Sequence, residues 1–202
     1  MFDIPAGLPS ELVPLSWLIG VWEGSGVLDY RIGEESVTRE FGHRVSFSHD
    51  GLPYLNYSSY TWLEAGPGSD EKVPLVTETG YWRLNRNQQE GDAGPAMLPG
   101  IGERPFNTTE SVETLRNSDG GFDIEVTLAH PGGVAELYLG QVKGPRIDLA
   151  TDAVMRTQGA KPYAAATRLY GLVENHLLWA WDIAALGQDL RTHASGRLAR
   201  AD

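Results

Sequence analysis

Cysteine is absent from the 202 residues of this chain. Its absence excludes disulfide bonds, zinc sites built from thiolates and catalysis by a cysteine nucleophile. Any metal or cofactor must therefore be held by histidine, carboxylate, tyrosine, methionine or backbone groups. Long apolar runs are missing as well. No stretch approaches the roughly 20 residues that a helix needs to cross a bilayer, so we expect no membrane span.

Positive charge is scarce. The chain has 16 lysine and arginine residues against 27 aspartate and glutamate residues, a formal net charge of -11. Because nucleic acids are bound largely through cations that neutralise phosphates, we expect no nucleic-acid partner. The acidic charge disfavours nonspecific association but is compatible with a specific homodimer. The first residues, "MFDIP", lack the basic and apolar segments of a secretory signal, which predicts a cytoplasmic protein.

What the chain does contain is glycine and proline spread along its length, 24 and 12 residues respectively. They bracket short segments in which apolar and polar residues alternate, a pattern typical of antiparallel strands. We find eleven such segments, from "LIGVWEGSGVLDY" through "TESVETLRN" to "LRTHASGRLAR". Eleven strands are too many for a half-covered sheet and suit a closed barrel, in which every strand edge is paired.

The predicted fold is therefore all-β: a single closed antiparallel barrel of about ten strands that forms one domain over residues 1–202. Only "PSELVPLSWL" is typical of a helix, with Ser10 as its N-cap, and we expect a short helical turn at one barrel end. Residues 85–107 are rich in glycine, proline and polar residues. We expect them to form a long inserted loop that shades the mouth of the barrel.

The stretch "GVWEGSG" is the most informative motif. Glycines weaken a strand unless it must bend or admit another backbone closely, as the first strand of a small barrel does. Trp22 is expected to plug one barrel end and to stack on Arg197 or Arg200 of the closing strand. The alternative is a tryptophan in an ordinary glycine-rich turn. The motif residues are Gly20, Trp22, Gly24 and Gly26.

Several stretches together resemble the nitrobindin family, small heme-binding β-barrels similar to fatty-acid-binding proteins and lipocalins. "GVWEGSG" resembles the family's Gly-x-Trp-x-Gly-x-Gly motif, and "LVTETGYWRL" its Glu-x-Gly-Tyr/Phe segment. "LAHPGGVAELYLG" and the last third of the chain, residues 166–200, resemble further family segments. The resemblance covers nearly the whole chain from Leu15 to Arg200. The family's Tyr-Pro-Thr-Ile segment is replaced here by "YRIGEESVTREF", so the resemblance assigns no residues to the distal wall.

By position, the resemblance implies that His193 is the axial ligand of a ferric heme b. A neutral imidazole nitrogen suits one axial position on iron. Arg168 and Lys161 are the implied partners of the heme propionates, as charge-assisted donors. An inward His193 would place Arg191 and Arg197 on the same face unless a β-bulge intervenes near Gly196.

The family resemblance further implies five-coordinate iron whose open position binds nitric oxide or reacts with peroxynitrite. The implied reaction is isomerisation of peroxynitrite to nitrate at the iron, with no general base. The alternative is a non-catalytic carrier of a fatty acid or another small apolar ligand, whose carboxylate is held by Arg168 or another inward basic group. A barrel that serves only as an interaction module is the third reading.

The other histidines form no metal set in the sequence. His43 and His49 share a strand face but lie ~20 Å apart, too far for one ion. His130 and His176 are interpreted as turn residues. Alternate aromatic residues such as Trp179 and Trp181 either line a pocket for a flat macrocycle or pack across strands.

Overall fold

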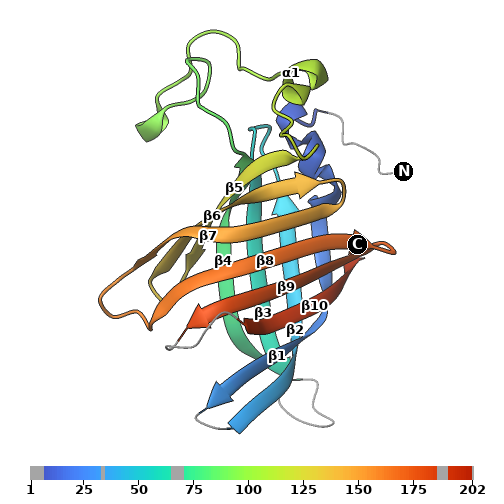
Figure 1. The fold of residues 1–202 in the computed structure, drawn as a ribbon, viewed down its shortest axis with the longest axis vertical. Helices are drawn as coiled ribbons and strands as arrows, with labels where there is room; N and C mark the ends of the chain where they lie inside the picture. The colour runs from blue at the N-terminus through green and yellow to red at the C-terminus, as the bar shows by residue number, and fades with distance from the viewer. Residues whose placement is uncertain (1–6, 33–34, 65–70, 186–190, 202) are drawn as a thin grey trace.

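A computed structural model describes residues 7–32, 35–64, 71–185 and 191–201. Its strands form a closed barrel in the order β1-β10-β9-β8-β7-β6-β5-β4-β3-β2, and every pair is antiparallel. The predicted all-β barrel of about ten strands is thus confirmed (Figure 1). In these ranges no helix is long and apolar enough to span a membrane. The "MFDIP" segment lies outside the described residues.

The strands follow one another around the barrel as a meander. Their bounds are β1 Gly20–Ile32, β2 Glu35–Ser48, β3 Leu55–Glu64, β4 Lys72–Leu84, β5 Phe122–His130, β6 Val134–Lys143, β7 Arg146–Arg156, β8 Tyr163–Val173, β9 His176–Ala185 and β10 Arg191–Ala201. Alternation defines the interior face. On β5, for example, Phe122, Ile124, Val126 and Leu128 are buried while the residues between them are not. This face forms the core because its apolar side chains leave water together.

One end of the barrel is closed by the 3-10 helix η1, Ser10–Leu18, which buries Leu12, Leu15 and Leu18. The predicted helical turn is therefore confirmed, but its N-cap is Pro9 and no side chain caps it, so the prediction for Ser10 is wrong. The Ser10 hydroxyl instead donates a hydrogen bond to the carbonyl oxygen of Asn107. We call this the closed end, and the opposite end, where β5 ends and β10 begins, the mouth.

Residues 85–107 lie at the closed end, so the expectation that they shade the mouth is wrong. The Arg86 guanidinium binds the Glu11 carboxylate of η1 at 2.7 and 2.9 Å and the Asp92 carboxylate at 2.7 and 2.8 Å. Arg86 and Glu11 are both buried, which makes this ion pair hard to separate. The segment includes the short 3-10 helix η2, Pro95–Met97, and is anchored over the end opposite the mouth (Figure 1).

One of the eleven predicted strands is a helix. The stretch "TESVETLRN" contains the α-helix α1, Thr109–Glu113, next to η1 at the closed end. Thr108 caps it by accepting from the backbone N–H of Ser111, whose side chain accepts from the Thr108 N–H in return. Such a capping box, together with Val112 and Leu115 at the i, i+3 spacing of one helix face, supports a helix rather than a strand.

The glycine motif of β1 allows the closing strand β10 to approach closely, as the sequence predicts. A Cβ added at Gly24 would collide with the carbonyl oxygen of Arg197 in β10, so only glycine permits this approach of β1 and β10. Trp22 is 1% exposed and donates from its indole nitrogen to the Leu18 carbonyl oxygen at 2.7 Å, which closes the barrel end. Arg200, rather than Arg197, stacks on Trp22 with its guanidinium carbon 4.8 Å from the ring centroid.

Candidate functional site

His193 lies near the mouth at an irregularity of β10. The β10–β9 register shifts between Thr192, which pairs with Asp182, and Ala194, which pairs with Trp181. His193 is thus the extra residue of a β-bulge, where two residues of one strand face one of the other. Its ring meets that of the interior Trp181 edge-on, with centroids 6.0 Å apart and planes at 88°. The bulge therefore turns the imidazole toward the barrel interior.

This bulge also explains how His193 and Arg197 of β10 can lie on opposite faces of the strand. The sequence required a bulge near Gly196 to separate His193 from Arg197, and the bulge is confirmed, although it lies earlier in the strand, at His193 itself. Arg197 is exposed and donates to His176 Nδ1 at 3.1 Å, away from the interior. The side chain of Arg191 lies outside the part that the structure describes.

Trp181 connects His193 with a buried polar cluster near the mouth, to which His130 at the end of β5 belongs. The Arg168 guanidinium lies over the Trp181 ring, 4.2 Å from its centroid. The His130 ring stacks on Trp181 with centroids 6.4 Å apart and an interplanar angle of 18°. One indole thus contacts the edge of His193, a guanidinium and a second imidazole. These contacts hold Trp181 in a single orientation beside His193.

Arg168 is buried, with 3% of its side chain exposed, and is already paired. It donates two hydrogen bonds to the Glu78 carboxylate, at 2.6 and 2.9 Å, and one to the Tyr138 hydroxyl at 3.1 Å. Its guanidinium also lies 3.7 Å from Glu136. The geometry is that of a bidentate arginine–carboxylate pair, among the strongest charge-assisted contacts in proteins. The structure therefore places Arg168 under Trp181, bound to protein carboxylates.

Glu136 is the second carboxylate of the cluster and its side chain is fully buried. It accepts hydrogen bonds from the hydroxyls of Tyr138 and Tyr163, at 2.6 and 2.7 Å, and lies 2.6 Å from His130 Nε2. Burial raises the pKa of both phenols, so they remain protonated donors. Every oxygen of this buried carboxylate thus has a donor, as a buried charge requires.

Glu78 stays ionised in the same cluster. Burial alone would raise the pKa of its carboxyl group, but the Arg168 guanidinium, with hydrogen bonds from Arg168 and Tyr57, lowers the pKa to about 2. The sequence did not single out Glu78 or Glu136, and it treated His130 as an incidental turn residue. The available signal was the pair of family segments "LVTETGYWRL" and "LAHPGGVAELYLG", which contain all three.

His43 is a second interior imidazole, deeper in the barrel. Its Nε2 lies 2.8 Å from the Ser59 hydroxyl, and its ring meets Trp179 edge-on at 5.0 Å. Burial lowers the pKa of His43 to about 4, so the ring is neutral near pH 7. His49 lies just beyond the end of β2, and among the described residues there is no group of three or more metal-ligating side chains.

Lys161 is exposed and lies between β7 and β8, which are joined at the mouth. Its backbone carbonyl oxygen accepts a hydrogen bond from Arg156 at 3.1 Å, which fixes the turn. The ammonium group is therefore available at the rim, whereas Arg168 lies below it. The structure brings His193 and Arg168 together through Trp181 and leaves Lys161 at the edge.

The interior near the mouth fits a heme. His193 supplies an imidazole, and the partly buried Trp181 and Ile183 supply an apolar wall. Val76, on the same face as Glu78, is 48% exposed, so the interior here is incompletely filled. Five buried ring nitrogens have no hydrogen-bond partner within the described ranges, and one of them, Trp181 Nε1, lies beside His193; the others are His43 Nδ1 and the Nε1 atoms of Trp17, Trp82 and Trp179. Such nitrogens are expected where a small polar molecule or water completes the site.

Similarity to known proteins extends over the full chain. A relative from Clavibacter michiganensis subsp. michiganensis named peroxynitrite isomerase is 71% identical over 202 residues, all of both chains. One from Leifsonia xyli subsp. xyli with the same name is 69% identical over the same length. The crystal structure of Rv2717c from M. tuberculosis matches with a TM-score of 0.66 and 26% identity, covering 99% of this chain and 100% of that one.

The family comparison agrees with the geometry. The model of the THAP4-like, heme-binding beta-barrel domain matches residues 11–200, which span η1 except Ser10, the ten strands except the last residue of β10, and the bulge at His193. The chain therefore belongs to the THAP4-like heme-binding β-barrel family, the nitrobindins.

Proposed function

We propose that this protein binds heme b through His193 and isomerises peroxynitrite to nitrate. The observation that carries the proposal is the β-bulge that turns His193 into the interior against Trp181. The full-length relatives named peroxynitrite isomerase support the same reaction. Bound heme supplies an iron centre that takes a small nitrogen-oxide ligand at its open axial position.

The protein residues orient and isolate that centre. Trp181 packs against one edge of His193 and restricts rotation of the imidazole. Arg168, held by Glu78, keeps Trp181 in place from below rather than pairing with a propionate. Lys161 at the rim is the propionate partner that we favour, because its ammonium group is exposed at the mouth. Aromatic and aliphatic side chains around these groups exclude bulk water from the pocket.

Titration of the purified chain with ferric hemin tests the proposal. Wild type is expected to give a saturable Soret band, and His193→Ala to shift or weaken it. His176→Ala is the matched control, because His176 lies at the closed end of the barrel and contacts Arg197 on the outside. Loss of the band in both variants, or in neither, would contradict the assignment of His193. Peroxynitrite decay and nitrate yield then report the reaction.

The alternative function, a carrier of a fatty acid, is less well supported because Arg168 is already paired. A fatty-acid carboxylate needs an interior cation, and the guanidinium named for that role already holds Glu78 at 2.6 and 2.9 Å. A second carboxylate would have to displace a buried one, which costs several kcal/mol. Extraction of the purified chain followed by mass spectrometry checks for bound lipid.

A further inference from the structure

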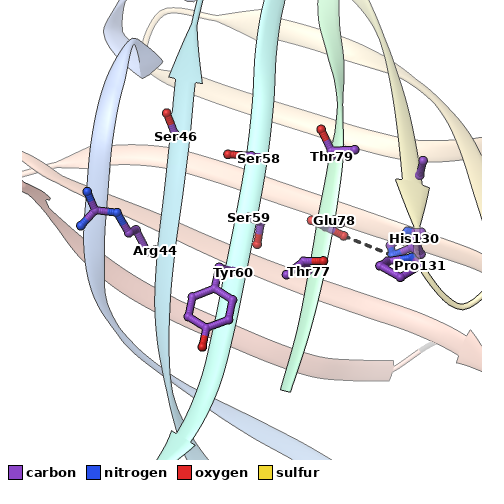
Figure 2. A pocket seen from close by; sticks show the side chains of 11 residues that line it. Arg44, Ser46, Ser58, Ser59, Tyr60, Thr77, Glu78, Thr79, His130 and Pro131 are labelled. Carbon is purple, nitrogen blue, oxygen red and sulfur yellow. Dashed lines mark ion pairs between the residues drawn. The ribbon is translucent and has the colours of Figure 1, made fainter. Parts of the chain in front are cut away.

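A cavity of about 580 Å³ lies beside β4, away from the rim at Lys161. Hydroxyl groups from the outer faces of β3 and β4, among them Ser58 and Thr77, form one side of it. Glu78 and His130 form another side, and both are interior residues (Figure 2). A single cavity thus borders residues from both faces of the barrel wall.

The hydrogen-bond ladder explains why the wall opens here. β4 pairs with β5 from Thr79, opposite Ala129, to Leu84, opposite Ile124. β5 ends at His130, so residues 72–78 of β4 extend past the last β4–β5 pair. The opening lies between β4 and the turn after His130 (Figure 2). It is a break in the wall next to the most polar part of the interior.

The inner end of this opening leads to the heme site. His130 Nδ1 lies 3.6 Å from Glu78 and its Nε2 lies 2.6 Å from Glu136. The His130 side chain is 14% exposed and stacks on Trp181, which contacts His193. Only one imidazole and one indole therefore separate the cavity from the axial histidine.

We propose that the opening between β4 and β5 is a lateral port for small nitrogen oxyanions, with His130 as the hydrogen-bonding group at its inner end. This rests on the proposed function. A macrocycle held by His193 occupies the mouth, so a small reactant benefits from a path through the wall. The port shares Glu78 and His130 with the polar cluster beside Trp181, and its other lining residues lie outside the heme site.

The lining suits a small anion. Serine and threonine hydroxyls donate hydrogen bonds without a fixed charge, and Arg44 adds a cation that Glu23 holds at 2.6 Å. Glu78 also faces the cavity, but its charge is offset by the bidentate Arg168 pair. With both ring nitrogens of His130 protonated, Nε2–H stays on Glu136, and Nδ1–H, which lies 3.6 Å from Glu78 and beyond hydrogen-bond distance of it, can be given to an oxyanion.

Blocking the port tests the proposal. In the ferric, hemin-loaded chain, Ala129→Trp or Thr77→Trp is expected to slow azide association by about fivefold or more. Both residues line the cavity and their side chains point outward. Ala153→Trp is the matched control, on the outer face of β7 and outside this cavity, and should change the rate less than about twofold. Wild-type azide rates in both blocking variants, with an unchanged Soret band, would overturn the port.

His130 is tested by comparing a charged with a neutral probe. His130→Leu is expected to slow azide association to ferric heme by about threefold or more, and carbon monoxide association to ferrous heme by less than about twofold. His130→Gln, which keeps a side-chain donor, should restore much of the azide rate. Equal slowing of both probes would mean that the residue only supports the wall, which contradicts the proposed role.

A readout without heme separates the port from the proposed function. Azide is added to the hemin-free chain and followed by nuclear magnetic resonance of the backbone amides. The port predicts concentration-dependent shifts at Glu78, Thr79 and His130 that Ala129→Trp reduces. Absence of these shifts would contradict the port even if the chain binds hemin. Shifts in a chain that binds no hemin would support the port and contradict the proposed heme function.

Discussion

The imidazole of His193 meets the indole of Trp181 edge-on, with the two ring centroids 6.0 Å apart. The two residues are brought together by a bulge that makes His193 the unpaired residue between Thr192 and Ala194. Without it, strict alternation counted back from the buried Leu198 and Ala194 would place His193 on the outer face. One irregular residue therefore decides whether the His193 imidazole faces the barrel interior.

Removal of Trp181 is expected to weaken hemin binding without unfolding the protein. Edge-to-face ring contacts contribute about 0.5–1.5 kcal/mol, so Trp181→Leu should lower hemin affinity by about 2- to 12-fold. Trp62→Leu is the control, because Trp62 packs on the outside under Lys72, whose ammonium nitrogen lies 3.9 Å from its ring centroid. Hemin titrations of both variants measure the difference, and equal affinities would show that the Trp181 contact is dispensable.

Replacement of Arg168 by leucine is expected to lower the free energy of unfolding by about 3–5 kcal/mol, because it leaves two buried carboxylates without their cation. The loss should be largest near neutral pH. In acid, Glu78 and Glu136 become protonated and no longer need the cation. Urea denaturation at several pH values measures this.

Arg146→Leu provides the comparison for Arg168. Arg146 binds Asp148 at 2.7 Å with 62% of its side chain exposed. Exposed pairs of this kind contribute about 0–1 kcal/mol, so this variant should remain close to wild type. Similar decreases in the free energy of unfolding for the two variants would mean that burial does not make the Arg168 pair more important for stability than an exposed pair.

His43 is expected to make stability depend on pH in mild acid. Its pKa is about 4 in the folded protein against 6.5 for an unperturbed histidine, and burial is the main cause. As pH falls from about 6.5 to about 4, the unfolded chain binds a proton that the folded chain refuses, so stability is lost over this window. The difference corresponds to about 3 kcal/mol.

The measurement is the free energy of unfolding between about pH 7 and pH 4.5, above the range in which most carboxylates titrate. His43→Leu should flatten this profile relative to wild type. His176→Leu, at the outer edge of β9, should retain the wild-type slope. Parallel profiles for wild type and His43→Leu would show that the His43 ring does not stay neutral in the folded protein.

Alternation of apolar and polar residues predicted most strands because it is a local pattern. The glycine motif predicted the Trp22–Arg200 stack because the first and last strands of a closed barrel must pair. The Arg168–Glu78 pair lies beyond such reasoning, since 90 residues separate its members. Which carboxylate meets Arg168 depends on the barrel's shear and on the register of strands between them. The prediction of a strand at α1 is wrong because it weighed neither the i, i+3 spacing of Val112 and Leu115 nor the capping box.

The glycine motif gives the last prediction, which concerns barrel closure. A methyl group at Gly24 would collide with the Arg197 carbonyl oxygen, which belongs to the β1–β10 ladder and cannot swing aside like a side chain. Gly24→Ala should therefore lower the free energy of unfolding by at least about 1–3 kcal/mol, the usual range for overpacking. Ser25→Ala, at the exposed neighbouring position, should change it by less than about 0.5 kcal/mol. Thermal and urea denaturation compare the two, and wild-type stability in Gly24→Ala would mean that β1 and β10 can separate enough to admit a side chain.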